Sequence, residues 1–429
     1  MKRRSSLLAT LLLAIPLYGA LTLSTSAPGH AAPPRPRPPL AIVGGTVHLG
    51  TGEVIEQGVV LVEGGRIQRV GKGLAPPPGA EIIDAQGAVV TPGLTDVLTG
   101  IGLVEVAAED ATRDDSLGGH DLIRAAFRVV DGYNPASVTI GVTRAEGVTS
   151  VGVVPSGGLV SGQSAWADLD GATTSEAIAQ APLALHVHLR VDEKSAGHAT
   201  ALLRLREALD DARAFATHRA AWERNQSRPF AASHLDLEAL GLALQRKVVV
   251  VFHVNRAADI LAVLNVAREF QLRPVIAGGA EAWRVSDALA QAKVPVIVFP
   301  LVTGPESFDT LGAREDNAAL LAAAGVPVIL STEETHNVRK LRQVAGNAVR
   351  AGLPHDTALA ALTRVPAEAF GMGARYGTLT PGKVANIAIW SGDPLEIGTQ
   401  VRALLIHGRP VSLRNRQTAL FEKYRRPPR

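Results

Sequence analysis

The segment from residue 91 to residue 100 reads TPGLTDVLTG, and it guides the interpretation of the rest of the chain. A Pro-Gly pair opens it, and the residues that follow have the length of a short buried strand. Side chains two positions apart point the same way along a strand, so Asp96, Leu98 and Gly100 share one face. On that face only Asp96 has a side chain that could bind a cation or a proton.

Six further apolar runs of strand length follow and alternate with stretches of helical periodicity. Their Val- and Ile-rich content is typical of parallel strands buried on both faces. The runs cover residues 147–154, 183–189, 248–253, 274–276, 294–299 and 326–330. The helical stretches cover residues 257–270, 284–292, 315–324, 338–351 and 356–362. The alternation predicts an α/β fold, a (β/α)8 TIM-like barrel, with the eighth strand expected within residues 190–246.

The start of the chain predicts a targeting segment. Three basic residues precede the mostly apolar run 7–23 and a small-residue cleavage site at Ala31, so residues 1–31 are interpreted as a secretory signal peptide. Pro16 interrupts the run, which disfavours the alternative of a membrane anchor. Residues 32–39 are Pro-rich and predict an extended linker. We therefore expect an exported protein, periplasmic or extracellular, with no stable membrane span after cleavage.

Composition narrows the range of partners. The first 31 residues hold three of the 43 Lys and Arg residues and none of the 40 Asp and Glu residues, so the mature chain is close to neutral. Nothing predicts nucleic-acid binding, and residues 416–429 are interpreted as a basic, solvated tail. The chain has no cysteine, which excludes disulfides. The expected partner is a small-molecule substrate or ligand, and the oligomeric state is left open.

Three stretches resemble the amidohydrolase superfamily, and within it the imidazolonepropionase-like group that includes secreted members. They are residues 87–96, 325–371 and 377–383. The resemblance extends over about residues 40–410, nearly the whole mature chain. Members of this superfamily hydrolyse carbon–nitrogen bonds other than linear peptide bonds.

The resemblance implies two structural parts. Residues 92–375 would form the TIM-like barrel, and residues 40–91 and 376–415, which contain short strand candidates, would form a small composite β-sandwich. The segment 160–171 resembles a β-loop of the secreted members, so it is interpreted as an excursion from the ring of barrel strands.

The resemblance also implies a metal site. The superfamily holds one or two divalent ions with histidines from the first, fifth and sixth strands and an Asp from the eighth, and the ion activates a water molecule. Here the first-strand positions hold Leu98 and Gly100 and the sixth-strand position holds Gly278, none of which ligates metal. His253 matches the fifth-strand histidine. Glu333 falls at the eighth-strand position, where its carboxylate could act as a base.

A relocated metal site is one alternative. His186 and His188 lie two positions apart on one predicted strand and therefore share a face. With His253, and with Glu333 or His336, they could bind a divalent ion such as zinc. Structural histidines without metal are the other alternative, because tight zinc binding needs three or four ligands.

Three functions remain open at this point. The first is an exported hydrolase of carbon–nitrogen bonds with a degenerate or altered metal site. The second is a non-catalytic barrel, a pseudoenzyme, that acts as a binding module. The third is a metal-free enzyme that uses Asp96, Glu333 and His253 as acid–base groups. Function depends on the site rather than on the fold, so the relative positions of these side chains decide.

Overall fold

Seven parallel strands form the central part of the protein in a computed structural model that describes residues 38–117, 121–189, 197–226 and 228–425. They are β6 (Leu94–Thr99), β7 (Val148–Val153), β11 (Ala184–His188), β12 (Val249–Val254), β13 (Pro274–Gly278), β14 (Val296–Val298) and β15 (Val328–Leu330). Strands β6 and β7 pair in one sheet, and β11 to β15 lie side by side in chain order in another. All seven strands predicted from the sequence are confirmed.

Three short strands lie between these two parallel groups. β8 (Val160–Gln163) pairs antiparallel with β11, whereas β9 (Ala165–Asp168) pairs antiparallel with β7. β10 (Ile178–Gln180) adds to the free edge of β9. The segment 160–171 therefore contributes antiparallel strands and no barrel strand, as expected.

The predicted closed ring of eight parallel strands is met only in part. The described residues of the segment 190–246 form the helices α3 (His198–Glu223) and α4 (His234–Leu244) and no strand. Within the described chain no backbone ladder joins β6 to β15, and the Thr95 N–H of β6 donates to the carbonyl of Leu362 at 2.8 Å. The fold is thus mixed α/β with the parallel strands of a TIM-like barrel.

Alternation along the strands creates two cores. In β12, Val249 and Val251 belong to an inner cluster, whereas Val250 and Phe252 pack in the outer core with residues of α5 (Ala257–Glu269). The other helices after β6 are α1 (Val138–Arg144), α2 (Thr174–Ala177), α6 (Ser286–Ala292), α7 (Asn317–Ala323), α8 (Leu341–Arg350), α9 (His355–Ala361) and α10 (Arg364–Ala369). The five helical stretches predicted from periodicity correspond to α5 to α9.

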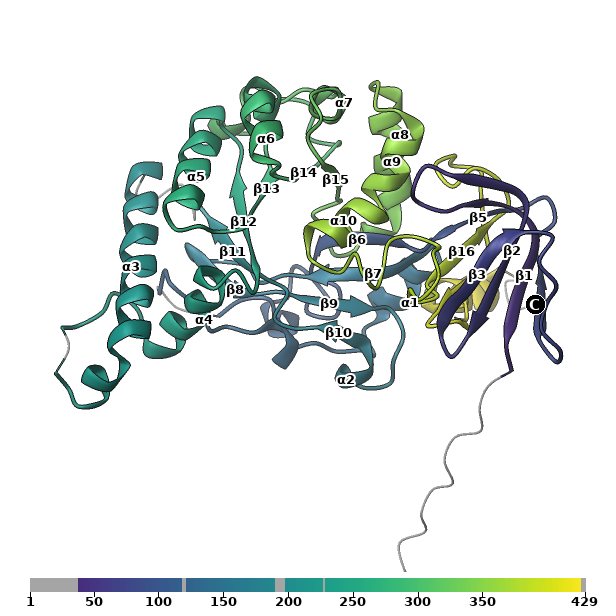
Figure 1. Ribbon diagram of the computed structural model, residues 1–429, viewed down its shortest axis with the longest axis horizontal. Helices are drawn as coiled ribbons and strands as arrows, with labels where there is room; N and C mark the ends of the chain where they lie inside the picture. Colours follow the sequence, from purple (N-terminus) through teal and green to yellow (C-terminus); the bar gives the residue numbers. More distant parts are fainter. Residues whose placement is uncertain (1–37, 118–120, 190–196, 227, 426–429) are drawn as a thin grey trace, which may run out of the picture. The chain divides into compact units, whose positions relative to one another are not determined.

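Strands from both ends of the described chain form one eight-stranded sheet. Its members are β1 (Leu40–His48), β2 (Val54–Glu63), β3 (Arg66–Lys72), β4 (Glu81–Asp84), β5 (Val89–Pro92), β16 (Ile387–Trp390), β17 (Val401–Ile406) and β18 (Arg409–Pro410). β16 pairs antiparallel with β5 and so joins the two ends, which Figure 1 shows as purple and yellow strands lying together.

The structure describes more of the C-terminal segment than of the N-terminal one. The predicted signal peptide and all but the last two residues of the linker lie outside the described residues. At the other end, the predicted solvated tail begins with a helix, α11 (Arg416–Tyr424), which buries none of its residues. No helix in the described part of the chain combines the length and apolar content needed to cross a bilayer.

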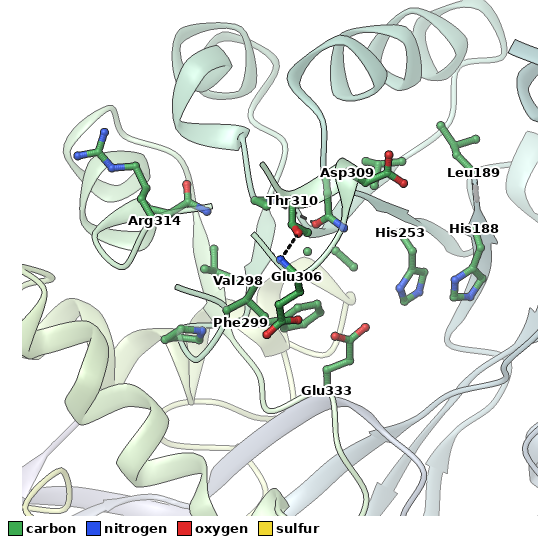
Figure 2. A pocket seen from close by; sticks show the side chains of 18 of the residues that line it. His188, Leu189, His253, Val298, Phe299, Glu306, Asp309, Thr310, Arg314 and Glu333 are labelled. Atoms are coloured by element: carbon green, nitrogen blue, oxygen red, sulfur yellow. Dashed lines mark hydrogen bonds between the residues drawn. The ribbon is translucent and has the colours of Figure 1, made fainter. Parts of the chain in front are cut away.

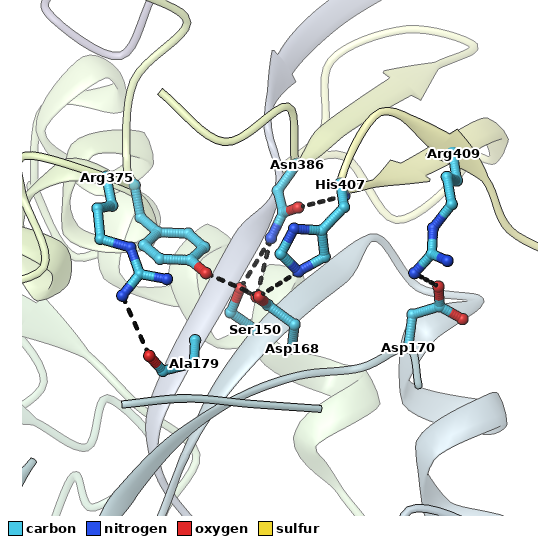
Figure 3. Close-up of polar contacts among 9 residues, drawn as sticks. Ser150, Asp168, Asp170, Ala179, Arg375, Asn386, His407 and Arg409 are labelled. Atoms are coloured by element: carbon cyan, nitrogen blue, oxygen red, sulfur yellow. Dashed lines mark hydrogen bonds and ion pairs between the residues drawn. The ribbon is translucent and has the colours of Figure 1, made fainter. Parts of the chain in front are cut away.

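A buried carboxylate connects β9 to this sheet and to β7 (Figure 3). Asp168, 1% exposed, accepts hydrogen bonds from Ser150 Oγ at 2.6 Å and Asn386 Nδ2 at 2.9 Å on one oxygen. Its other oxygen accepts from Tyr376 Oη at 2.8 Å and lies 2.8 Å from His407 Nε2. The Ser150 hydroxyl donates to the aspartate and not to the histidine, so these residues are a structural junction and not a nucleophilic triad.

Candidate active site

A pocket of about 270 Å³ opens at the carboxyl ends of β11 to β15 (Figure 2). Parallel strands all end at this edge, so side chains at their last positions meet there. The polar residues that matter most for its chemistry are His188, His253, Asn255, Glu306, Arg314 and Glu333.

Three histidines come together beside the pocket, which His188 and His253 line and the fully buried His186 does not. His186 and His188 point to the same face of β11 as Ala184, and His253 points to the same face of β12 as Val251. Ala184 and Val251 belong to the inner cluster, so the three histidines lie on the inner faces of their strands. His188 and His253 are register partners, and their rings stack with centroids 3.9 Å apart. His186 Nδ1 lies 3.1 Å from His253 Nε2. The structure thus gathers the three candidate ligands, while their binding of a metal stays a prediction.

Burial keeps these imidazoles neutral. Desolvation lowers the pKa of His186 to about 3 and that of His188 to about 4, and proximity to His188 adds to the effect on His186. The pKa of His253 is lowered well below its ordinary value by burial and then by the two neighbouring rings. At neutral pH each ring therefore has one N–H donor and one nitrogen lone pair, which is the form that binds metal.

The donor chemistry of the cluster suits a single divalent ion. The Nε2 atoms of His186 and His188 are buried without a hydrogen-bond partner, which is rare for a polar atom. Within the described ranges, however, no three His, Asp or Glu side chains are already arranged around one point as metal ligands. His186 and His253 contact each other instead, so an ion would have to replace that contact. His336, the other candidate, is exposed and does not line the pocket.

At the positions where the resemblance implies metal ligands, this chain has residues that cannot bind metal, and neighbouring side chains pack closely around them. Leu98 is 2% exposed within the inner cluster. A β-carbon added at Gly100 would lie 2.5 Å from Thr335 Oγ1. Gly278 has a φ of +87°, which L-residues rarely adopt, and a β-carbon there would lie 2.5 Å from Asn255 Oδ1. Single histidine substitutions would therefore not rebuild the family's metal site.

Glu333 contributes a carboxyl group from the segment that follows β15. In Figure 2 this group is directed towards the side of the pocket that carries the histidines. Burial among protein atoms raises the pKa of Glu333 to about 7, with further increases from Asp96, Glu334 and Glu306. The residue is nevertheless exposed to solvent, because its side chain borders the pocket. A carboxyl group with this pKa can accept and return a proton near neutral pH.

Asp96, the other predicted acid–base residue, is fully buried and does not line the pocket. Its carboxylate accepts hydrogen bonds from Ser331 Oγ at 2.5 Å, from Thr332 N at 3.0 Å and from Thr332 Oγ1 at 2.7 Å. The Leu98 N–H adds a fourth at 3.3 Å. Burial raises the pKa of Asp96, and these donors act in the opposite direction.

Two of the pocket residues that sequence interpretation missed are a histidine and an arginine. His198, taken there as structural or surface, lines the pocket with its ring nitrogens 3.1 Å from Asp259 Oδ2 and 3.4 Å from Asp309 Oδ1. Arg314 lines the pocket and is paired with Asp316. In the sequence, each of these two residues is marked only by its place near the start of a predicted helix. Many surface residues lie at such places, so this feature does not identify a pocket residue.

Comparisons with known sequences agree with this architecture. A sequence model of the amidohydrolase family matches residues 136–412. The chain is 26% identical to amidohydrolase TasK of Hapsidospora irregularis over 398 residues, which are 82% of this chain and 39% of that protein. A stretch of 94 residues is 37% identical to an imidazolonepropionase of Chromobacterium violaceum and covers 21% of this chain and 23% of that enzyme. The chain thus spans well under half of the length of either relative.

A solved structure resembles this one over most of its length. An amidohydrolase from Thermotoga maritima superposes with a TM-score of 0.79 at 28% sequence identity. The match covers 87% of this chain and 100% of that one.

Proposed function

The chain belongs to the amidohydrolase family, and from this premise we propose that it is an exported hydrolase of carbon–nitrogen bonds other than peptide bonds, with an altered metal site. Its active site is the pocket at the carboxyl ends of β11 to β15. The observation that supports this best is the Glu333 carboxyl group, with a pKa of about 7, in one pocket with the neutral imidazoles of His188 and His253. A volume of about 270 Å³ suits a small amide or cyclic amide.

Glu333 transfers the proton in this proposal. Its carboxylate accepts a proton from water as the water oxygen attacks the carbonyl carbon, and the resulting acid returns that proton to the leaving nitrogen as the carbon–nitrogen bond breaks. The imidazole N–H groups of the pocket are suitable donors to the carbonyl oxygen, on which negative charge develops.

The amidohydrolase family generally binds divalent metal ions. We propose that His186, His188 and His253 hold one ion in this chain, and that it is zinc, because zinc accepts imidazole ligands readily. The two unpartnered Nε2 atoms support this assignment. When bound, such an ion polarises a carbonyl group or lowers the pKa of a water molecule.

The finer architecture is part of the same proposal. The two groups of parallel strands would together form a (β/α)8 TIM-like barrel of residues 92–375, and the eight-stranded sheet would be a β-sandwich from residues 40–91 and 376–415. The strand order supports this division. The signal-peptide pattern of residues 1–31 and the Pro-rich residues 32–39 support export to the periplasm or the extracellular space.

A binding module is the second candidate function. The observation that favours it is the presence of Leu98, Gly100 and Gly278 at three inherited ligand positions, where a β-carbon added at either glycine would lie 2.5 Å from a neighbouring side-chain oxygen. A barrel that has lost its metal ligands can keep the pocket and bind a ligand without converting it.

A substrate panel separates the two functions. We expect the purified mature protein, supplied with zinc, to hydrolyse at least one compound among lactams, cyclic imides, N-acyl amines and imidazolonepropionate, with rates that saturate with substrate. Release of the carboxylate and amine products would be followed by chromatography. Saturable binding of a panel compound in calorimetry, without any product, would instead establish the binding module.

A further inference from the structure

The segment that presents Glu333 is attached to a carboxylate on a different strand. Ser331 and Thr332 follow β15, and both hydroxyl groups and the Thr332 N–H donate to Asp96 on β6 at distances between 2.5 and 3.0 Å. Ser331 and Asp96 are both fully buried. These bonds bridge the boundary where β6 and β15 form no backbone ladder, so they fix this end of β15 relative to β6.

A second hydrogen bond carries this attachment to Glu333 itself. Ser331 Oγ donates its proton to Asp96 and accepts the N–H of Glu333 at 3.1 Å. Glu333 has a φ of +53°, in the left-handed region that residues with a side chain rarely adopt. A conformation of this kind persists only where its surroundings enforce it. The Asp96–Ser331 pair supplies that enforcement.

The hydrogen bonds of Asp96 favour its ionised form. The N–H groups of Leu98 and Thr332 can only donate, and the hydroxyl groups of Ser331 and Thr332 are placed to donate, so these four bonds oppose the burial that raises the pKa of Asp96. In its ionised form, Asp96 lies close enough to Glu333 to raise the pKa of the Glu333 carboxyl group.

We infer that Asp96 is a positioning residue, which acts through Ser331 and Thr332 to hold the Glu333 carboxyl group in its working place. This inference rests on the proposed role of Glu333 and adds the residues on which that role depends. Asp96 itself touches neither the pocket nor a substrate within it. The direct acid–base role that the sequence suggested for Asp96 is thereby replaced by an indirect one.

Four other titratable groups lie around Glu333 and can influence the titration of its carboxyl group. Glu334 on the same segment and Glu306 on the connection between β14 and α7 contribute carboxyl groups. His188 of β11 and His253 of β12 contribute neutral imidazoles. None of them is altered by a substitution at Asp96 or Ser331.

The first test is Ser331→Ala, with Ser150→Ala as its matched control. Both substitutions remove a buried serine hydroxyl that donates to a buried carboxylate, at 2.5 Å and 2.6 Å respectively, but only Ser331 is bonded to Glu333. We expect kcat to fall about 10- to 100-fold in Ser331→Ala with KM within about twofold, because the base is displaced while the pocket is intact. Ser150→Ala should keep kcat within about twofold. Equal kcat values for both variants and the native protein would overturn the inference.

The second test does not depend on turnover. The titration of the Glu333 side chain is followed by 13C NMR of the labelled protein, with Glu333→Gln to identify its signal. In Ser331→Ala, which removes no charge, the midpoint should move by about 1 because the Glu333 carboxyl group is displaced, whereas Ser150→Ala should keep the native midpoint. An unchanged midpoint in folded Ser331→Ala would overturn the inference. If instead no panel compound is hydrolysed but the midpoint shifts, the positioning holds and only the proposed catalytic role of Glu333 fails.

Discussion

Glu333→Gln should reduce hydrolysis by at least about 100-fold, because the amide can neither accept the proton of water nor return it to the leaving nitrogen. The measurement is kcat/KM on the substrate identified from the panel. Glu334→Gln is the matched control, since Glu334 is an adjacent, exposed carboxylate that does not line the pocket. Activity that survives in Glu333→Gln but not in Glu334→Gln would show that the wrong carboxylate has been assigned.

The pH dependence follows from the same group. A base must be ionised, so kcat/KM of the native protein should rise with pH through a midpoint near 7, the raised pKa of Glu333. An unperturbed glutamate would give a midpoint near its ordinary 4.5. A profile that is flat between pH 5 and 8 would contradict the assignment.

The stability of Glu333→Gln should change in the opposite direction to its activity. The pKa of Glu333 is raised on folding, so its stabilising contribution is present below the unfolded pKa and is lost as the pH rises through about 7. Glutamine does not ionise and avoids this loss. At pH 8 the variant should therefore melt at a higher temperature than the native protein, and this difference should disappear towards pH 4.

Asp168→Ala should destabilise the fold by about 3–5 kcal/mol, because it leaves the donors of Ser150, Asn386 and Tyr376 buried without an acceptor. Burial and the nearby carboxylate raise the pKa of Tyr376, so this phenol remains a donor over the accessible pH range. Urea unfolding at neutral pH gives the free energy directly.

Asp170→Ala is the matched control for this prediction. Asp170 lies two residues further along and pairs with Arg409 at 2.8 Å and Arg144 at 3.6 Å, but it is 25% exposed. Ion pairs with this solvent access contribute at most about 1 kcal/mol. Similar losses for the two variants would show that Asp168 is not the junction between β7, β9 and the eight-stranded sheet.

The parallel strands were predictable because their chemistry is local. Runs such as residues 248–252 are apolar at every position, which is typical of a strand buried on both faces. The completion of the ring was not predictable in the same way. Whether β6 bonds to β15 depends on where the carbonyl of Leu362 lies, and this is set by packing between segments far apart in the sequence.

The candidate site was likewise predictable only in part. Parity alone predicted that His186 and His188 share a face, and the register of β11 with β12 then brings them to His253. Sequence could not separate Asp96 from Glu333 as acid–base groups, because the difference lies in long-range bonds to Ser331 that take Asp96 out of the pocket. Likewise, the left-handed backbone of residue 278 is a property of the fold and was visible in the sequence only as a glycine.

We propose that this chain retains a hydrolytic pocket although Leu98, Gly100 and Gly278 stand where the resemblance implies metal ligands. Counting the zinc bound per chain, after saturation and gel filtration, is the measurement for this proposal. We expect one ion per chain, lost in His253→Ala, because the proposed ligands are His186, His188 and His253. Two ions per chain, no ion, or one ion that His253→Ala retains would show that this cluster is not the metal site.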